Sequence, residues 1–415
     1  MKRETDRHIH DSTNSLTVRL TVVGLVLLCI NPSFMQGHDN MNILLNVGMC
    51  LSPFGLLIKD ARTFIPRIDL PLCTVIITVL FAPFFFHPDT VRLSTMLFTC
   101  AYCVYFMMLA RLVKISGLGS GLFLKLIRVI IYTFAVVLVI QQLCVLMNLP
   151  VPLKAINYHN PWKLNSLTAE PSHTTVILST LLFFYTRTLR HRNPAATLLT
   201  SIRLHPWLWI SYLWTLFTTD NASAYIMGPL CLLPYITRKN IPYILILVVA
   251  LLITAFLVPL KRPTNVERVL NTITAVTSLN DQEIIKADTS ASARLVPTLR
   301  GARALAGSDM QIITGHGVDA DQRDLEARPC DVNERGFAGI FSIWYNYGII
   351  CSLAFWIAIG FVTIIKRDWM SYVTFAMTVQ LSADYNMQLG WMIMAFAMVF
   401  KYSIYGKRNF LSSSF

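Results

Sequence analysis

Residues 70–86 read LPLCTVIITVLFAPFFF, an unbroken run of apolar and small residues without a charged side chain. A helix of this length, rising about 1.5 Å per residue, crosses most of the ~30 Å hydrocarbon core of a bilayer. The composition agrees, because the 415 residues are 54% hydrophobic and only 14% charged, whereas soluble domains average about 25% charged residues. With a mean hydropathy of +0.55, the chain is predicted to be an all-α, polytopic integral membrane protein.

Further apolar runs of about 17 to 25 residues mark the other candidate spans. All the candidates lie near residues 16–35, 41–58, 70–86, 91–112, 128–147, 173–187, 206–219, 222–237, 241–260, 338–365, 370–386 and 388–404. Because 206–219 is short and the last two runs are barely separated, we expect about 10 to 12 transmembrane helices. They predict an N-terminal bundle of about nine spans over 1–260 with an outer loop at 148–172, a large, partly helical outer loop over 261–337, and C-terminal helices with a tail over 338–415.

The positions of the positive charges predict which side each loop faces. If the N-terminus is cytoplasmic, most of the 35 Lys and Arg residues fall in inner segments, as with Lys59 and Arg62 or Arg111 and Lys114. This is the positive-inside pattern, and it places both termini in the cytoplasm. Residues 261–337, with ten basic and eleven acidic residues, are almost neutral. The net charge of +13 therefore reflects anchoring of the loops at an anionic inner leaflet, which leaves the lipid bilayer as a partner and excludes nucleic acid.

Other features of the composition exclude further classes. The polar first fifteen residues, with no small-residue cleavage site after the first apolar run, predict a retained helix instead of a signal peptide. Eight of the nine cysteines fall in predicted spans, which excludes a disulfide framework, and no Cys/His spacing suggests a metal site. Cys100 and Cys103 form a CxxC inside a span, where packing as small hydrophobic residues is the simplest interpretation.

The large outer loop shows helical patterning of its own. Thr264 to Glu267 matches a capping box before an amphipathic helix predicted over 265–278. A second helix is predicted from Pro297 to Ala306, with proline in its first turn and Gly307 as its stop. The loop is therefore expected to fold into a small cap.

Three arginines, Arg294, Arg300 and Arg303, surround the apolar stripe of the second helix. They form either a solvated helix face that touches lipid headgroups or an anion site, because guanidinium groups bind phosphate oxygens bidentately. On the outer face, the phosphates available without nucleotides belong to lipid-linked intermediates. Further along, Gly315-His316-Gly317 forms either a plain turn or a point of close backbone approach.

The shorter outer loop ends with KLNSLTAEPSH at 163–173 and runs directly into a span. A charged glutamate where a loop enters the membrane costs free energy unless it has a functional role or an ion-pair or hydrogen-bond partner. Glu170 is therefore either a helix cap favoured by the helix dipole or a general base that orients an acceptor hydroxyl. Asp220 and Asp384, at outer span ends, are interpreted as structural hydrogen-bonding residues.

Several of these segments resemble the O-antigen and exopolysaccharide polymerases of bacteria. They are EPS at 170–172, FTTDNASAYI at 217–226, ASARLVPTLRGARAL at 291–305, ITGHGVD at 313–319 and NERGFAGIFSIWYNYGII at 333–350. The resemblance implies a membrane-integral glycosyltransferase of the O-antigen polymerase and ligase superfamily, in the bacterial inner membrane with its large loop in the periplasm. It implies undecaprenyl-diphosphate-linked glycans as donor and acceptor, a chain-length regulator and a flippase as candidate partners, and no metal, cofactor or nucleotide sugar.

The resemblance also assigns roles to single residues. A fixed cation at the departing diphosphate is the most useful protein group in this reaction. The expected catalytic residues are Glu170 and Arg294, the diphosphate-binding residues are Arg294, Arg300, Arg303 and Lys163, and the glycan-binding residues are His173, His316 and Asn333.

Three other functions are weighed against polymerisation. O-antigen ligases typically enter the span after the long loop with a histidine and a small polar residue, but Phe337 and Ala338 stand there, ten positions before Gly348. A 12-span polysaccharide flippase or transporter predicts two related halves and charged residues in mid-span, and neither is evident. An acyltransferase would use a catalytic residue near a cytoplasmic loop, where His191 and His205 lie among arginines that topology already explains.

Overall fold

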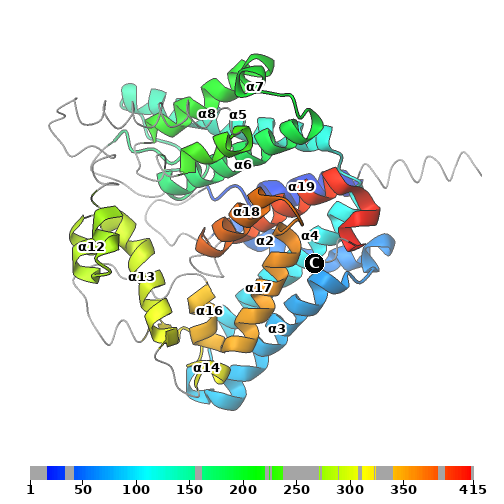
Figure 1. Ribbon diagram of the computed structural model, residues 1–415, viewed down its shortest axis with the longest axis vertical. Coiled ribbons are helices and arrows are strands. Elements are labelled where there is room, and N and C mark those ends of the chain that lie inside the picture. Colours follow the sequence, from blue (N-terminus) through cyan, green and yellow to red (C-terminus); the bar gives the residue numbers. More distant parts are fainter. Residues whose placement is uncertain are drawn as a thin grey trace, which may run out of the picture. The chain divides into compact units, whose positions relative to one another are not determined.

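The computed structural model describes residues 16–32, 42–154, 161–219, 224, 227–236, 271, 273–287, 289–306, 311–321, 323, 340–381 and 388–412. Every regular element in these ranges is a helix, which confirms the all-α class (Figure 1). The chain divides into two compact units. The first unit comprises residues 1–28, 46–118 and 274–415, and the second comprises 29–45 and 119–273. This division differs from the three sequential parts expected from the sequence, because the helices that follow residue 274 pack with those that precede residue 118.

Four described helices are long and apolar enough to cross a membrane, which supports membrane association. They are α3 (Pro66–Phe86), α4 (Leu93–Ser116), α5 (Ser120–Leu146) and Gln388–Gly406 within α19 (Gln388–Ser412). Shorter apolar helices include Leu16–Leu27 and Ile349–Thr363. The expected set of about 10 to 12 full spans is therefore not shown.

Prolines and glycines break several of the predicted spans. The run 41–58 becomes α2 (Ile43–Leu51) followed by the 3-10 helix η1 (Ser52–Leu57), and the run 338–365 becomes α16 (Ile340–Tyr347) and α17 (Ile349–Thr363), which are separated at Gly348. Within 222–237 the structure describes the 3-10 helix η4 (Gly228–Tyr235), which contains two prolines. A proline donates no backbone hydrogen bond and so interrupts a helix. Because proline and glycine do not lower the hydrophobicity of a run enough to divide it, the apolar pattern did not predict these interruptions. The run 241–260 lies outside the described residues.

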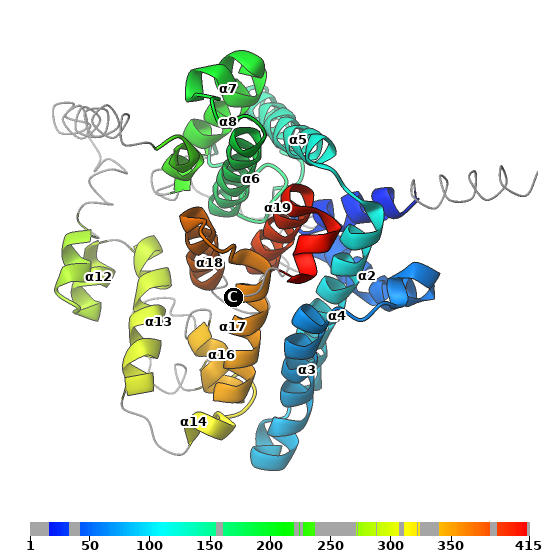
Figure 2. The same cartoon turned by 45° about the vertical axis from the view of Figure 1, so that its right-hand side comes forward.

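In the first unit, α3 packs between α4 and α17, and α17 packs against α19 and α18 (Trp369–Leu381) (Figure 2). Trp391 of α19 contributes to this core by stacking on Tyr102 of α4, with the ring centroids 5.6 Å apart. Tyr105 of α4 donates a 2.8 Å hydrogen bond to the carbonyl of Gly24. Aromatic rings and a small residue at the helix contact therefore join segments that are distant in the sequence.

Basic residues gather at one end of the first unit, which we call the basic end and define by Arg67, Arg111, Lys114, Lys366 and Lys401. The Arg111 side chain pairs with Asp69 at the start of α3, and the Tyr402 hydroxyl of α19 donates to the carbonyl of Lys114. The Lys401 ammonium donates to two carbonyls at the end of α17, at 2.9 and 3.1 Å. Loops predicted to lie on one side of the membrane are thus brought together.

The second unit is built from α5, α6 (Pro171–Arg192), α7 (Leu198–Leu204) and α8 (Pro206–Thr218). Helix α5 packs against α6 and α8, and every α6 residue from Thr174 to Thr188 is buried. A guanidinium nitrogen of Arg128 lies 3.1 Å from Nε2 of His205. Ser201 of α7 accepts a 3.3 Å hydrogen bond from the indole of Trp209 in α8.

The described part of the large loop folds into α12 (Asp281–Ala287), α13 (Thr289–Ala306) and α14 (Gln311–Thr314). The predicted start of the second helix is wrong, because α13 begins eight residues before Pro297 and carries this proline inside it. The added turns are stabilised by packing, since Val296 is buried against Ile284 of α12. The predicted capping box at 264–267 and the stop at Gly307 lie outside the described residues.

Candidate functional site

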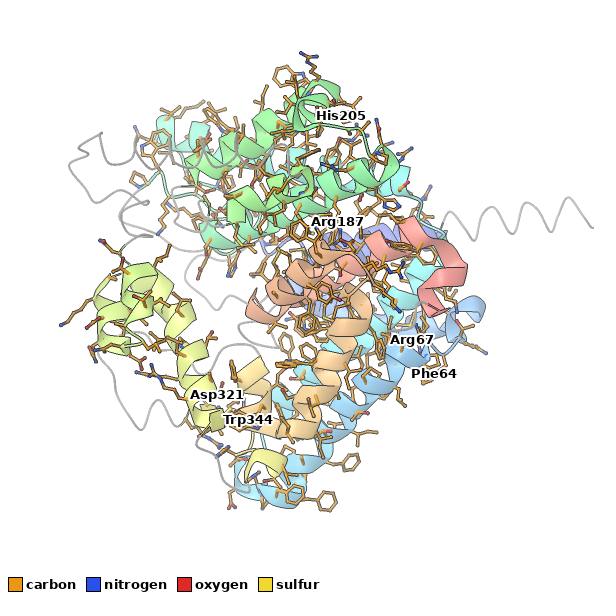
Figure 3. All side chains as sticks on the ribbon, viewed as in Figure 1. Phe64, Arg67, Arg187, His205, Asp321 and Trp344 are labelled. Carbon is orange, nitrogen blue, oxygen red and sulfur yellow. The ribbon has the colours of Figure 1, made fainter. Side chains whose placement is uncertain are left out.

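Polar groups gather at the end of the first unit opposite the basic end. This polar end consists of residues 87–95, which join α3 to α4 through the 3-10 helix η3 (Pro88–Thr90), together with residues 315–321 and 342–348. The 21 residues of α3 run from one end to the other, and at a rise of about 1.5 Å per residue they separate the two ends by about 31 Å. Figure 3 shows Arg67 well apart from Asp321 and Trp344, and Figure 1 shows α14 beside α16.

Glycines allow residues 315–321 to lie directly against the end of α16. Gly315, Gly317 and Gly348 have φ angles of +74°, +98° and +84°, in the region that L side chains rarely adopt. A Cβ on Gly315 would lie 2.6 Å from the carbonyl oxygen of Asn346. The glycines thus allow close backbone approach, and the backbone that approaches is that of Asn346 at the end of α16.

Backbone hydrogen bonds join this segment to α16. The N–H of His316 donates to the carbonyl of Tyr345 at 2.8 Å, and the N–H of Gly317 donates to that of Asn346 at 3.1 Å. The last carbonyls of a helix lack partners within the helix. The segment supplies these partners, so its conformation is fixed by the end of α16.

Asp321 anchors the segment through its side chain. Its buried carboxylate accepts hydrogen bonds from the Ser342 hydroxyl at 2.7 Å and from the Asn346 amide at 2.9 Å. Its own N–H donates to the side-chain oxygen of Asn346 at 3.1 Å. Ser342 and Asn346 lie one turn apart on α16, so one carboxylate fixes the segment against one helix face.

Asp319 joins the same segment to the start of α4. Its carboxylate accepts from Arg92 at 3.3 Å and from the hydroxyl of Thr95 at 3.1 Å. The Arg92 side chain is 54% exposed, whereas that of Asp319 is 11% exposed. Asp319 has a φ of +54°, a conformation that aspartate tolerates better than most residues. The site thus presents an exposed cation that is paired with a largely buried carboxylate.

Aromatic rings complete the polar end. The rings of His316 and Tyr345 stack with centroids 3.9 Å apart and planes 8° apart, and both residues are partly exposed. Nδ1 of His316 lies 3.2 Å from the carbonyl oxygen of Tyr345, which can only accept, so the proton of a neutral His316 is on Nδ1. Trp344 packs against Tyr345 at 71° with centroids 6.0 Å apart, and its buried indole nitrogen has no hydrogen-bond partner in the described structure.

The predicted arginine cluster lies on α13, and Asp281 of α12 is its acidic partner. Nε of Arg300 lies 2.9 Å from one Asp281 oxygen, and a terminal nitrogen of Arg303 lies 3.0 Å from the other. Arg303 also donates to the carbonyl of Leu279. The backbone of Arg294 lies on the same helix, and its side chain lies outside the described atoms. Sequence analysis missed Asp281, because nothing in the pattern links an acid to arginines about twenty positions later.

Glu170 occupies the N-cap position of α6, but its side chain forms no capping hydrogen bond. One carboxylate oxygen accepts from the Ser172 hydroxyl at 3.2 Å. The loop before it is fixed by buried polar contacts, including a 2.7 Å hydrogen bond from Ser166 to the carbonyl of Phe134. The dipole of α6 still favours a negative charge at this position, so part of the helix-cap interpretation stands.

The predicted site residues fall in two separate units. Lys163, Glu170 and His173 belong to the second unit, whereas His316 and the arginines of α13 belong to the first. Asn333, Asp220 and Asp384 lie outside the described residues. Among the residues that are described, no group of three or more His, Cys, Asp or Glu side chains could hold a metal ion.

Comparison with known proteins adds no relative. No protein-family profile matches the chain, and neither a curated protein nor a solved structure is significantly similar to it. The function is therefore argued from the site. Stacked rings beside an exposed guanidinium and a carboxylate suit a ligand with both an apolar face and many hydroxyl groups.

Proposed function

We propose that the chain is a membrane glycosyltransferase that polymerises undecaprenyl-diphosphate-linked oligosaccharide repeat units at the periplasmic face of the bacterial inner membrane. One observation carries the proposal. The polar end, with its rings and polar groups, lies at the opposite end of the span-length helices from the basic end. If the basic end faces the cytoplasm, as the positive-inside pattern predicts, the polar end faces the side of the membrane where a lipid-linked glycan would be polymerised.

In the proposed reaction, the bond between the anomeric carbon of the donor glycan and its diphosphate oxygen breaks. A hydroxyl of the acceptor glycan forms the new glycosidic bond, and its proton passes to the Glu170 carboxylate. The lipid diphosphate leaves with the bonding electrons, and Arg294 stabilises its charge. We assign the diphosphate first to Arg294, with Arg300, Arg303 and Lys163 in support. Arg300 and Arg303 are already held on α13 by their shared partner Asp281.

The proposal predicts that Arg294→Ala abolishes polymerisation. In a strain that lacks its own copy, the variant should reduce chains longer than one repeat unit by about 100-fold or more, the usual effect of losing a group that stabilises developing charge. Membrane protein levels should stay unchanged. Lys286→Ala is the matched control, because Lys286 is an exposed basic residue of neighbouring α12.

Gel analysis of the surface glycan distinguishes the outcomes. A normal long-chain ladder from Arg294→Ala would remove this residue from the mechanism. In the deletion strain, single capped repeats indicate a polymerase, no repeat on the acceptor indicates a ligase, and intact lipid-linked repeats retained in the cytoplasm indicate a flippase. Glu170→Gln is compared with Glu170→Ala, and full polymerisation by the Gln variant would exclude a base at this position.

A further inference from the structure

We infer that His316, Tyr345 and Trp344 form a subsite for one pyranose ring of the glycan. The subsite lies at the polar end, and His316 is its only member expected from the sequence. The inference rests on the proposed function for the identity of the glycan, and it adds the groups that bind one sugar of it.

The ring pair of His316 and Tyr345 is more exposed than the residues that support it. His316 and Tyr345 are partly exposed, whereas Asp321, Ser342 and Asn346, which fix the segment and the helix that carry them, are each 3% exposed or less. Buried, mutually hydrogen-bonded side chains hold the groups of a binding site in a fixed geometry. The polar end thus fixes two partly exposed rings with a buried hydrogen-bonded network.

The ring pair and its charged neighbours are chemically complementary to a sugar. A pyranose ring presents C–H groups on one face and hydroxyls around its edge. The face of an aromatic ring is electron-rich and attracts such C–H groups. Asp319 of the same segment and its partner Arg92, whose side chain is 54% exposed, offer an acceptor and donors for hydroxyls. An acyl chain would use the rings but would have no use for this pair of charges.

In the described part of the chain, the indole of Trp344 carries an unpaired hydrogen-bond donor beside the ring pair. Its nitrogen is buried and without a hydrogen-bond partner in the described ranges, and the residue is 3% exposed. A buried donor without an acceptor is costly. Trp344 packs against Tyr345, one of the two stacked rings. Trp344 therefore places this donor next to the ring pair, and Trp344→Phe tests whether the glycan uses it.

The subsite is tested by direct binding. The probe is the lipid-free repeat-unit oligosaccharide, released by mild acid from the surface polysaccharide of the source strain. It is titrated against the purified full chain in detergent micelles, with saturation-transfer NMR as the readout. Tyr345→Ala should weaken binding by about tenfold, as expected for loss of one aromatic contact. Tyr345→Phe keeps the ring and should stay within about twofold.

Tyr372→Ala is the matched control, because Tyr372 is 55% exposed on α18 and lies outside the polar end. It should bind as the unchanged protein does. If Tyr345→Ala does not fold, Trp344→Phe carries the test. It keeps an aromatic ring, removes the indole donor, and should weaken binding by about fivefold. Unchanged binding by a folded Tyr345→Ala, or by Trp344→Phe where the former does not fold, would overturn the subsite.

The binding titration of Tyr345→Ala and the polymerisation assay of Arg294→Ala together distinguish failure of the subsite from failure of the proposed function. If Arg294→Ala abolishes polymerisation but folded Tyr345→Ala binds the oligosaccharide normally, the subsite is wrong and the function stands. If Tyr345→Ala loses binding while Arg294→Ala polymerises normally, the subsite stands and the proposed role of Arg294 fails.

Discussion

The buried ion pair at the basic end gives the sharpest prediction about stability. Two nitrogens of the Arg111 guanidinium contact the two oxygens of Asp69, at 2.8 and 3.0 Å. Asp69 also accepts a 2.5 Å hydrogen bond from the N–H of Ile65, and Arg111 donates to the carbonyl of Met107 at 2.8 Å. The side chains are 1% and 9% exposed, so water does not screen the pair. The pair joins α3 to α4.

The predicted magnitude follows from what remains after one partner is removed. Arg111→Met leaves the Asp69 carboxylate buried with a single backbone donor. Breaking a buried pair in this way costs about 3–5 kcal/mol. Replacing both partners, as in Asp69→Leu with Arg111→Met, removes both charges and should restore most of the lost free energy of unfolding, because apolar replacements of buried pairs are often neutral.

The assay is reversible unfolding of the purified chain in mixed micelles, with helicity followed by circular dichroism. The double-mutant cycle gives the coupling energy between the two side chains. Lys114→Met, on the same helix and partly buried, is the matched control and should stay within about 0.5 kcal/mol of the unchanged protein. The reasoning is refuted if Arg111→Met costs less than about 1 kcal/mol or if the double variant is as unstable as the single one.

Two further predictions concern a glycine and a histidine. Gly315→Ala should shorten the surface glycan, because its Cβ would meet the carbonyl of Asn346; Gly117→Ala, also at positive φ but with open space around its Cβ, should leave glycan length unchanged, and equal effects would contradict the steric argument. Burial, and then Arg128, lower the pKa of His205, so the unfolded chain binds a proton more readily. Thermal stability should therefore fall as the pH drops below about 6.5. The thermal stability of His205→Gln should fall less over the same pH range. An equal decline in both proteins would exclude His205 as the cause.

Composition and apolar runs predicted much of the architecture. They predicted an all-α chain with membrane-crossing helices, and α3 and α4 overlap the runs at 70–86 and 91–112. Helix α5 overlaps the run at 128–147 but begins eight residues before it. An apolar run consists of residues that are neighbours in the sequence, so the hydrophobicity pattern predicts it directly. The positive charges were also informative, because loops expected on one side meet at the basic end of the first unit.

The candidate site was predicted only in part. His316 was selected from the sequence, whereas Tyr345, Asp319 and Asp321 were not. The three unselected residues acquire their importance from partners distant along the chain, such as Arg92 for Asp319, 227 positions away. The periodicity of a sequence does not predict side-chain contacts between residues that are so far apart along the chain.

The sequence by itself determined that the chain is helical, apolar and asymmetric in charge, because these properties depend on each residue and its near neighbours. The tertiary structure decided which polar groups meet. It paired Asp69 with Arg111, gave Arg300 and Arg303 a shared carboxylate, and joined residues 315–321 to the end of α16. The physical reason is that a buried polar group must find a partner, and the packing of helices determines which partner lies within reach.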